Sequence, residues 1–447
     1  MKILRDNKPF RFSPTQILSL GFVVIILVGT LLLSLPISTS KGTSISLIDA
    51  LFQATSAICV TGLTVVNTAQ DLSIFGQIIT IILIQIGGLG FMTMATTVFL
   101  VAGKRITLRE RLIMQEALNH FTIQGVVRLT KNILATTLIL EGAGAVLLAF
   151  RFIPMFGWIK GIYFSIFHSI SAFCNAGFDL MGNSLLDFSG DIIINFTIMA
   201  LIILGGLGFS VIRDVYNHRY HFRKWHLHTK LVVLSTIILL LSGFLFFFIM
   251  EYDNVLANFS LKDKIIASLF HSVTIRTAGF YSTPMEEITE ASKFFTIILM
   301  FIGASPASTG GGIKTVTAMV IILTVKSVIE GKDDIEIFRR RIPYAIANRA
   351  LAITVISLGF LVFVTIIFSI VEPYPFIDLL FQTSSALGTV GVASFDNSML
   401  SNISKLLTIL CMYTGRVGPL TLTLAFAKRQ SSNNNLIKYP EDQIMVG

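Results

Sequence analysis

The sequence predicts an all-α membrane protein with eight transmembrane helices and four re-entrant loops, arranged as four parallel repeats around one pseudo-fourfold axis. Hydrophobic residues make up 53% of the 447 residues and charged residues only 13%, whereas soluble domains carry about 25% charged residues. Long and short apolar segments alternate along the chain, and a glycine-containing loop recurs four times. The apolar content excludes intrinsic disorder, and the scarcity of charge excludes a set of large soluble domains.

Apolar segments of two lengths define the helices. Eight are long enough to cross a hydrocarbon core roughly 30 Å thick, which takes about 20 helical residues. They lie near 16–36, 75–102, 131–152, 191–212, 228–250, 291–325, 346–371 and 402–427. Shorter segments of 13–16 residues lie near 46–59, 158–173, 260–275 and 375–387. These cannot span the membrane, and they predict half-helices that enter and leave it on one side.

The same order recurs in four units: a spanning helix, a short helix, a glycine loop and a second spanning helix. The predicted divisions are the N-terminus with the first unit (1–102), the second unit (103–212), the third unit with a broken second helix (213–330), the fourth unit (331–427) and a C-terminal tail (428–447). Each unit has an even number of spans, so all units have the same orientation. Parallel repeats of this kind surround an axis normal to the membrane.

The basic residues indicate the orientation. The net charge is +9, and 24 of the 34 Lys and Arg lie at the termini or between units, in residues 1–14, 103–131, 213–230, 326–349 and 428–447. The segments between the two spanning helices of each unit, which contain the short helices, have few basic residues but several acids, including Asp71, Asp179, Glu286 and Asp396. By the positive-inside rule, we expect a multi-pass protein of the cell membrane with both termini cytoplasmic and the re-entrant loops opening outward. This distribution accounts for the positive charge without nucleic acid as a partner.

Residues for covalent chemistry are not recognisable in the sequence. The three cysteines, Cys59, Cys174 and Cys411, are too few for a disulfide framework, and no CxxC or HExxH spacing indicates a metal site. We find no Ser/His/Asp set and no pair of carboxylates at membrane depth. We therefore expect that the chain is not an enzyme and holds no organic cofactor.

The four glycine loops align as Val60-Thr61-Gly62, Asn175-Ala176-Gly177, Thr277-Ala278-Gly279 and Thr389-Val390-Gly391. A non-helical backbone is tolerated at membrane depth only where it is buried or lines a water-filled path. Glycine permits the backbone angles and the close approach that direct carbonyl oxygens at a dehydrated cation. One such loop could be a tight turn between helices, but four in register predict a cation path on the shared axis.

The sixth spanning segment is interrupted. It contains Gly303-Ala304-Ser305-Pro306-Ala307-Ser308-Thr309-Gly310-Gly311-Gly312, followed by Lys314. A proline and three consecutive glycines cannot maintain a regular helix. A phosphate-binding P-loop is rejected, because Ile313 stands where that motif needs glycine. The interpretations left are a gate on the cation path and a packing kink, and the number of glycines favours the gate.

Three basic residues lie within or next to these segments. Arg416 lies in an otherwise apolar span, where a charge is expensive and usually functional; the alternative is a structural arginine bound to helix-end carbonyls. Lys314 is expected to extend toward the cytoplasmic edge. Arg276 is expected to anchor its glycine loop through carbonyls. His168 and His271, just before two of the loops, are expected to form hydrogen bonds with the short helices rather than bind metal.

At these loops the sequence resembles the Trk/Ktr/HKT superfamily of cation transporters, most closely the Ktr-type potassium-uptake membrane subunits, over essentially the whole chain. The resemblance implies M1–pore helix–M2 repeats and potassium uptake through one pore per subunit. It also implies a homodimer controlled by a cytosolic, ATP- or ADP-binding RCK-type ring of the KtrA or KtrC kind. K+ is then the transported ion, and Na+ is allowed as an activator.

The resemblance assigns roles to residues. Gly62, Gly177, Gly279 and Gly391 match the four filter glycines. K+ would be held at Val60, Asn175, Thr277 and Thr389. Residues 303–312 with Lys314 and Arg416 would form the gate below the filter. Glycine rather than serine at position 62 favours potassium, but a sodium-permeable protein of the same fold and a secondary transporter remain alternatives.

Two further segments have open interpretations. The stretch 332–341 is either a partner-facing loop or a site of attraction to lipid headgroups. The tail residues 438–442 resemble the family's C-terminus at the dimer interface. The histidines between 218 and 228 are expected to form a solvated docking surface rather than a metal site.

Overall fold

The computed structural model of the chain describes residues 14–90, 93–94, 112–113, 126–219, 221–419 and 421–422. Among these residues the structure is helical apart from short 3-10 turns, loops and one two-stranded hairpin, which confirms the all-α class. Most of the basic stretch 103–131 lies outside the described residues. So does the tail 428–447 with its predicted dimer contact.

The helices follow the predicted order within each unit. The first helices are α1 (Pro14–Leu33), α6 (Val126–Phe156), α10 (Leu227–Met250) and α14 (Tyr344–Val371). The short helices are α2 (Leu47–Cys59), α7 (Trp158–Phe173), α11 (Leu261–Thr274) and α15 (Phe376–Gly388). The second helices begin as α3 (Ile74–Leu89), α8 (Ile192–Leu207), α12 (Glu290–Phe301) and α16 (Asn402–Val417). The short helices agree with the predicted half-helices to within one residue at each end.

The connecting elements are short. After α8 and α12 the chain continues in α9 (Phe209–His218) and α13 (Thr315–Ile329). Strands β1 (Ile335–Ile337) and β2 (Arg340–Ile342) form an antiparallel hairpin between α13 and α14. The 3-10 turns are η1 (Pro36–Ser38), η2 (Leu186–Phe188), η3 (Phe222–Lys224) and η4 (Asn397–Met399).

Polar side chains fix the beginning of each second helix. Ser73, Asp191, Thr289 and Ser401 each precede one of these helices, and their side-chain oxygens accept a hydrogen bond from a backbone N–H of its first turn. The C-terminal end of the preceding long helix holds three of these caps. Arg151 of α6 pairs with Asp191, while Glu251 and Glu372 accept hydrogen bonds from Thr289 and Ser401.

The prediction of eight continuous spans is not confirmed. Within the described residues, α1, α6, α10 and α14 are long and apolar enough to cross a membrane, and α8 with α9 would make a fifth span. The predicted helix 191–212 is wrong as a continuous element, because α8 and α9 are bent by 97° around Gly208. Gly208 has a φ of +91°, which ends the helix at low steric cost. The number of membrane crossings therefore stays a prediction.

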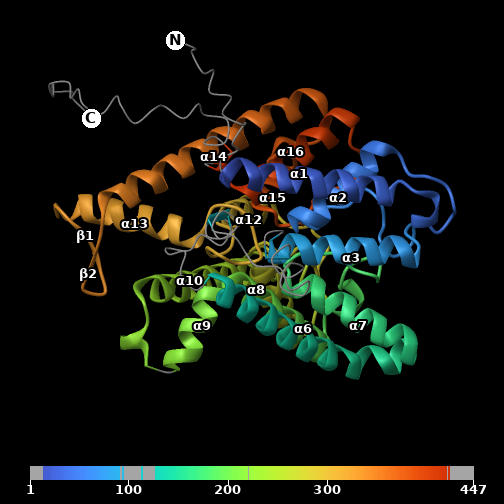
Figure 1. Ribbon diagram of the computed structural model, residues 1–447, viewed down its shortest axis with the longest axis horizontal. Helices are drawn as coiled ribbons and strands as arrows, with labels where there is room; N and C mark the ends of the chain where they lie inside the picture. The colour runs from blue at the N-terminus through green and yellow to red at the C-terminus, as the bar shows by residue number, and fades with distance from the viewer. Residues whose placement is uncertain are drawn as a thin grey trace, which may run out of the picture.

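Contacts between the units form a closed ring. Each second helix packs against the short helix of the following unit: α3 on α7, α8 on α11 and α12 on α15, while α16 packs on α2. In Figure 1, α9 and the β1–β2 hairpin lie at one end of the long helices, and the outer ends of α2 and α7 lie near the other. These contacts support the predicted arrangement of the units around one axis.

Charged and polar side chains join neighbouring units at the end that holds the starts of the second helices. Lys293 of α12 lies 2.7 Å from Asp378 of α15, and Lys405 of α16 lies 2.7 Å from Asp49 of α2. At the equivalent position of α3, Gln77 accepts a hydrogen bond of 3.0 Å from Tyr163 of α7. Each contact joins the fourth residue of a second helix to the short helix that follows in the ring. Sequence analysis did not predict these contacts.

The core surrounds the short helices. Phe52, Phe167, Phe270 and Phe381 occupy equivalent positions on the four short helices, and each is at most 1% exposed. Burial of such a ring removes about 150–250 Å² from solvent or lipid. The four phenylalanines therefore fix the short helices from within, so that the glycine loops at their ends face the axis.

Candidate functional site

The four glycine loops share one backbone conformation. The residue two positions before each glycine is left-handed, with φ of 54° at Val60, 59° at Asn175, 69° at Thr277 and 51° at Thr389. The glycines also have positive φ, between 70° and 96°. A non-glycine residue in this region costs about 1–3 kcal/mol and persists only where its surroundings determine it. The same strained position in all four loops indicates that the conformation serves the site.

The loops meet at the axis. A Cβ atom added to Gly62 would lie 2.6 Å from the carbonyl oxygen of Ala176, and one added to Gly177 would lie 2.7 Å from that of Ala278. A Cβ on Gly279 would lie 3.0 Å from the carbonyl oxygen of Val390, and one on Gly391 would clash with that of Thr61. The structure therefore brings all four glycines together, each against the carbonyl of another loop.

Hydroxyl groups hold the loops in two ways. In the first and fourth loops the N–H of Gly62 and Gly391 donates to the hydroxyls of Ser56 and Ser385, at 3.1 Å in both cases. In the second loop the hydroxyl of Ser171 donates to the carbonyl of Phe178 at 2.7 Å. Thr274 makes the corresponding bond to Phe280 in the third loop. The four units are thus similar but not identical.

One position on each short helix fixes the chain beyond the loop. It is occupied by Gln53, His168, His271 and Gln382. His168 contacts the Phe164 carbonyl through Nδ1 and accepts from the backbone N–H of Leu180 through Nε2. This confirms the expected hydrogen bonding of His168, whereas His271 contacts the hydroxyl of Thr296 on α12 rather than its own short helix. The side chain of Gln53 donates to Thr68, and that of Gln382 donates to Asn397. No role was predicted for the two glutamines, although their alignment with the histidines was a usable signal.

A cavity of about 630 Å³ lies above the glycines, which contribute to its floor. Its lining includes one acidic residue from each unit: Asp71, Asp179, Glu286 and Asp396. No Lys or Arg lines it among the described residues. Burial, together with the carboxylates of Asp179 and Glu286, raises the pKa of the nearby Tyr281 to about 12. The cavity is therefore a negatively charged vestibule that attracts cations.

Residues 302–314 fold back on themselves below the glycine loops. The N–H of Gly303 donates to the carbonyl of Ile313 at 2.8 Å, and the N–H of Ala304 donates to that of Gly311 at 3.3 Å. The N–H groups of Ser305 and Thr309 donate to the carbonyls of Gly206 and Gly205 on α8. The interruption is therefore an ordered loop attached to a neighbouring unit rather than a simple kink.

The 302–314 loop also touches three of the glycine loops. The hydroxyl of Thr309 lies 3.2 Å from the Asn175 amide oxygen, and the N–H of Gly311 donates to the hydroxyl of Thr389 at 3.0 Å. A Cβ on Gly310 would clash with the Thr277 hydroxyl. The loop is thus seated directly beneath the three left-handed residues, and its glycines permit the close approach.

Arg416 joins the 302–314 loop to the first unit. Its guanidinium donates to the backbone carbonyl of Thr309 and to the carbonyls of Gly87 and Gly88 at the end of α3. The planar fork of arginine can serve several acceptors at once. The structure contains the contacts that both sequence interpretations require, since Arg416 binds helix-end carbonyls and also contacts the predicted gate.

Two expectations for basic side chains are wrong. Lys314 does not extend toward the membrane edge, because its ammonium group donates to the carbonyl of Gly310 at 2.8 Å within the same loop. Arg276 forms no side-chain hydrogen bond to a carbonyl of the described residues, and its Nε is buried without a partner there. The predicted anchoring of the glycine loop by Arg276 is therefore not observed.

A buried carboxylate was missed. Glu141 lies in α6, and the amide of Gln85 on α3 donates to both of its carboxylate oxygens at 3.1 and 3.2 Å. The thiol of Cys174, next to Asn175, lies 3.8 Å from the same carboxylate. One acid within an apolar span was the signal that could have revealed it. This network joins the second glycine loop to the helix whose end binds Arg416.

The chemistry of the site is that of neutral oxygen ligands. The carbonyls of Thr61, Ala176, Ala278 and Val390, one from each unit, face the junction of the loops. Such oxygens replace the hydration shell of a monovalent cation. Within the described part of the chain, no group of three or more His, Cys, Asp or Glu residues is arranged to hold a metal ion.

Known proteins resemble the chain over its whole length. A family model described as TrkH, cation transport protein, matches residues 5–437. The chain is 45% identical over 452 residues to the Ktr system potassium uptake protein B of Bacillus subtilis (strain 168), with all of both chains covered. It is 40% identical, again over all of both chains, to the potassium/sodium uptake protein NtpJ of Enterococcus hirae. The crystal structure of the potassium transporter TrkH from Vibrio parahaemolyticus matches with a TM-score of 0.69 and 20% identity, covering 95% of this chain and 87% of that one. The structural match supports the fold alone.

Proposed function

The chain belongs to the TrkH family of cation transport proteins, and on that premise we propose that it is the ion-conducting membrane subunit of a potassium uptake system. The observation that supports this most directly is the meeting of four glycine loops with one carbonyl from each unit facing the junction. The chain's similarity to potassium uptake proteins suggests K+ as the ion.

The proposed path begins at the vestibule. Its four acidic residues raise the local cation concentration by attraction at long range. A potassium ion then loses water to the carbonyls beside Val60, Thr61, Gly62 and their counterparts Asn175–Gly177, Thr277–Gly279 and Thr389–Gly391. These twelve residues form the proposed selectivity filter. Neutral carbonyls bind the ion tightly enough to dehydrate it and weakly enough to release it.

The 302–314 loop is the proposed gate, with Arg416 as its latch. The loop contacts Asn175, Thr277 and Thr389 of the filter and is fixed from the opposite side by the Arg416 guanidinium. The positive charge of Arg416 opposes a cation below the filter. Opening requires that the loop leave these contacts, and the adjacent glycines lower the steric cost of that movement.

Regulation would come from another polypeptide. The names of the Ktr system relatives refer to a system of components. We propose that the subunit forms a homodimer and binds a cytosolic RCK-type ring that responds to ATP or ADP. In this arrangement both termini and α9 face the cytoplasm, and the vestibule faces outward.

Uptake in a cell without its own potassium transporters tests the function. Co-expression of the chain with a Ktr-type cytosolic subunit is expected to restore growth at low potassium. Growth that fails with every such subunit, although the chain is present in the membrane, would contradict the proposal. The matched control is Gly391→Ala, which places a methyl group against the Thr61 carbonyl and should abolish the rescue.

A sodium-permeable protein is the second candidate, because one relative is named a potassium/sodium uptake protein. Parallel uptake measurements of the two ions distinguish the candidates. Sodium influx equal to potassium influx at equal concentrations would favour the second.

A further inference from the structure

A strained hairpin tip contacts the turn that joins α9 to α10. The two residues between β1 and β2 are Phe338 and Arg339, with φ of 51° and 60°. Left-handed angles at both central residues are typical of a type I′ turn, for which Asn-Gly is strongly preferred. Phenylalanine and arginine are unfavourable there, so their presence points to a use for the exposed side chains.

The tip is seated against an aromatic residue of the other segment. The rings of Phe338 and Phe222 lie 5.8 Å apart in an edge-on arrangement. The ammonium group of Lys230 lies over both, at 5.2 Å from Phe222 and 5.9 Å from Phe338. Phe222 and Phe338 are nevertheless 44% and 38% exposed. The two segments thus form one surface, here called the basic–aromatic patch: Phe222, Arg223, Lys224, Lys230, Phe338, Arg339 and Arg340.

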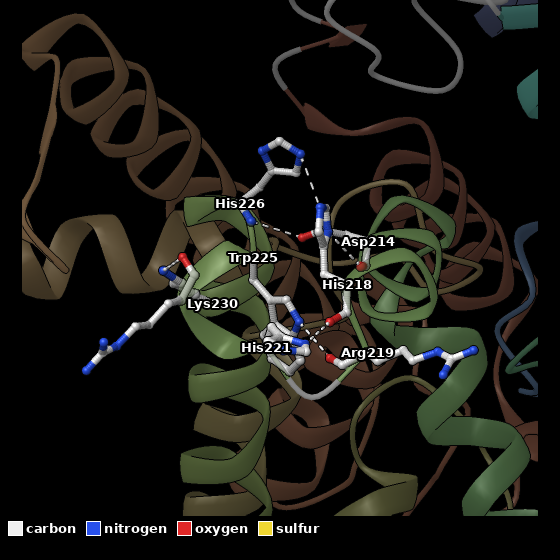
Figure 2. Close-up of polar contacts among 8 residues, drawn as sticks. Asp214, His218, Arg219, His221, Trp225, His226 and Lys230 are labelled. Atoms are coloured by element: carbon white, nitrogen blue, oxygen red, sulfur yellow. Dashed lines mark hydrogen bonds and ion pairs between the residues drawn. The ribbon is translucent and has the colours of Figure 1, made fainter.

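A buried aspartate holds the α9–α10 turn in place. Asp214 of α9 contacts His218 at 2.9 Å and accepts a hydrogen bond of 3.0 Å from the backbone N–H of His226 (Figure 2). The indole of Trp225 donates to the carbonyl of Arg219, and the ammonium group of Lys230 donates to that of Arg223. The turn is therefore a fixed scaffold, and its basic side chains project from it.

The positive charge of the patch is not neutralised within the chain. Arg223, Lys224, Arg339 and Arg340 are exposed, and none forms an ion pair with a carboxylate of the described residues. Two nearby acids have other partners, since Asp334 pairs with Arg341 and Glu330 pairs with Lys332, and the nearby Asp333 and Glu336 form no ion pair with the patch. The patch therefore fits an anionic ligand.

The neighbouring helices indicate where that ligand lies. Val328 and Ile329, at the last turn of α13, are 73% and 79% exposed. Such exposure of large apolar side chains at the end of an apolar helix is typical of contact with lipid. The hairpin begins six residues later, and Lys230 lies in the first turn of the spanning helix α10. This places the patch at the level of the lipid headgroups, where aromatic and basic residues are typically enriched.

We propose that the basic–aromatic patch binds the headgroup phosphates of anionic phospholipids in the adjacent leaflet. Guanidinium and ammonium groups on both sides of the Phe222–Phe338 contact bind the phosphates, and the two rings pack against the glycerol and upper acyl region. The proposal rests on the membrane location of the chain and does not require ion conduction.

Tryptophan quenching tests the proposal directly. The chain has two tryptophans, Trp158 and Trp225, so Trp158→Phe leaves a reporter 5.3 Å from Phe222 in the patch. The full chain is reconstituted in vesicles of phosphatidylcholine and phosphatidylglycerol at three to one, with bromine on the acyl chains of one lipid at a time. When the two samples contain the same mole fraction of brominated lipid, brominated phosphatidylglycerol is expected to quench Trp225 more strongly than brominated phosphatidylcholine.

Charge removal identifies the residues. Two double variants are made in the Trp158→Phe background: Arg223→Gln with Lys224→Gln, and Arg339→Gln with Arg340→Gln. Each should lower the preference for phosphatidylglycerol roughly five-fold or more. The control pair, Lys41→Gln with Lys262→Gln, removes the same charge at the opposite end and should leave the preference unchanged. Arg339→Gly separates binding from folding, because glycine suits the left-handed turn yet removes the charge.

Two results would overturn the inference. One is equal quenching by the two brominated lipids in the unaltered patch. The other is a lipid preference that survives all patch variants while binding of a purified Ktr-type cytosolic subunit is lost, which would make the patch a protein-docking surface. Neither result decides whether the chain conducts potassium, which is measured separately.

Discussion

The ammonium group of Lys405 lies 2.7 Å from the carboxylate of Asp49, although the two residues are 356 positions apart. Lys405 is in the last helix described and Asp49 in the first turn of the first short helix. The pair therefore joins the two ends of the ring of units. Lys293 and Asp378 make the equivalent contact one unit earlier.

Lys405→Met is expected to destabilise the protein. It leaves the Asp49 carboxylate without its partner in a largely buried position, which costs about 1–3 kcal/mol after allowance for the exposure of Asp49. Thermal unfolding of the purified protein in detergent measures the loss. The double variant Lys405→Met with Asp49→Asn should recover part of it, and additive effects of the two single changes would show that the pair is not coupled.

Gly62→Ser is expected to reduce the preference for potassium over sodium. A Cβ at this position lies 2.6 Å from the Ala176 carbonyl and would displace one of the ligand oxygens. A relative change of about 1.4 kcal/mol in the binding of the two ions lowers selectivity ten-fold. Uptake of both ions in the same cells measures the ratio. Gly359→Ser, where no atom lies within 4 Å of an added Cβ, serves as the control.

Arg416→Ala is expected to raise potassium flux in the absence of a cytosolic subunit. The change removes donors to the carbonyls of Thr309, Gly87 and Gly88, and each charge-assisted bond contributes about 1.5–3 kcal/mol to the closed loop. Flux into proteoliposomes measures the leak. Arg416→Lys keeps the charge but cannot contact all three acceptors, so an intermediate leak is expected. A flux that is lower in both variants, with intact protein, would argue against a latch.

Neutralising the four vestibule acids is expected to weaken potassium uptake at low ionic strength. The combined changes Asp71→Asn, Asp179→Asn, Asp396→Asn and Glu286→Gln remove the attraction that concentrates cations above the proposed filter, with a loss of about ten-fold in apparent affinity. The difference should shrink when choline chloride screens the field. Asp253→Asn with Glu290→Gln removes acids that do not line the cavity and should have little effect. A loss that does not depend on ionic strength would point to a structural role instead.

Low pH is expected to reduce the stability that Glu251 contributes where the end of α10 contacts the start of α12. Burial alone would raise the pKa of Glu251, but hydrogen bonds from Ser292, Thr289 and Asn254 lower it below its ordinary value of 4.5. A carboxylate with a lowered pKa stabilises the folded state above pH 4.5, and this contribution is lost as the pH falls through the native pKa. Thermal unfolding at pH 7 and pH 4 should therefore differ less in Glu251→Gln than in the unaltered protein. An identical pH dependence would exclude this contribution.

Local features of the sequence were sufficient to predict the short helices and the glycine loops. The short helices were recognisable because they are too short to span a membrane. The loops were recognisable because each has a glycine, such as Gly62 or Gly177, where it approaches the other loops. The contacts of Glu141 could not be predicted in this way, because its partners Gln85 and Cys174 lie 56 and 33 residues away. The direction of Lys314 was also mispredicted, since only the folded loop supplies the Gly310 carbonyl in reach of its ammonium group.

The left-handed break at Gly208 explains another failure. Residues 192–212 are mostly apolar, and hydropathy alone favours one continuous helix. The Pro306 carbonyl lies 2.6 Å from the position of a Cβ on Gly208, so packing against the 302–314 loop favours a glycine there. That tertiary contact is absent from any local pattern.

The packing of α16 against α2 has a consequence for biosynthesis. When only the first three units have been synthesised, the ring of units is still open, because the fourth unit is encoded last. An unfinished or truncated polypeptide would therefore lack one of the four carbonyl groups that face the junction of the glycine loops. The junction of the four loops is thus completed only after the last unit has been synthesised.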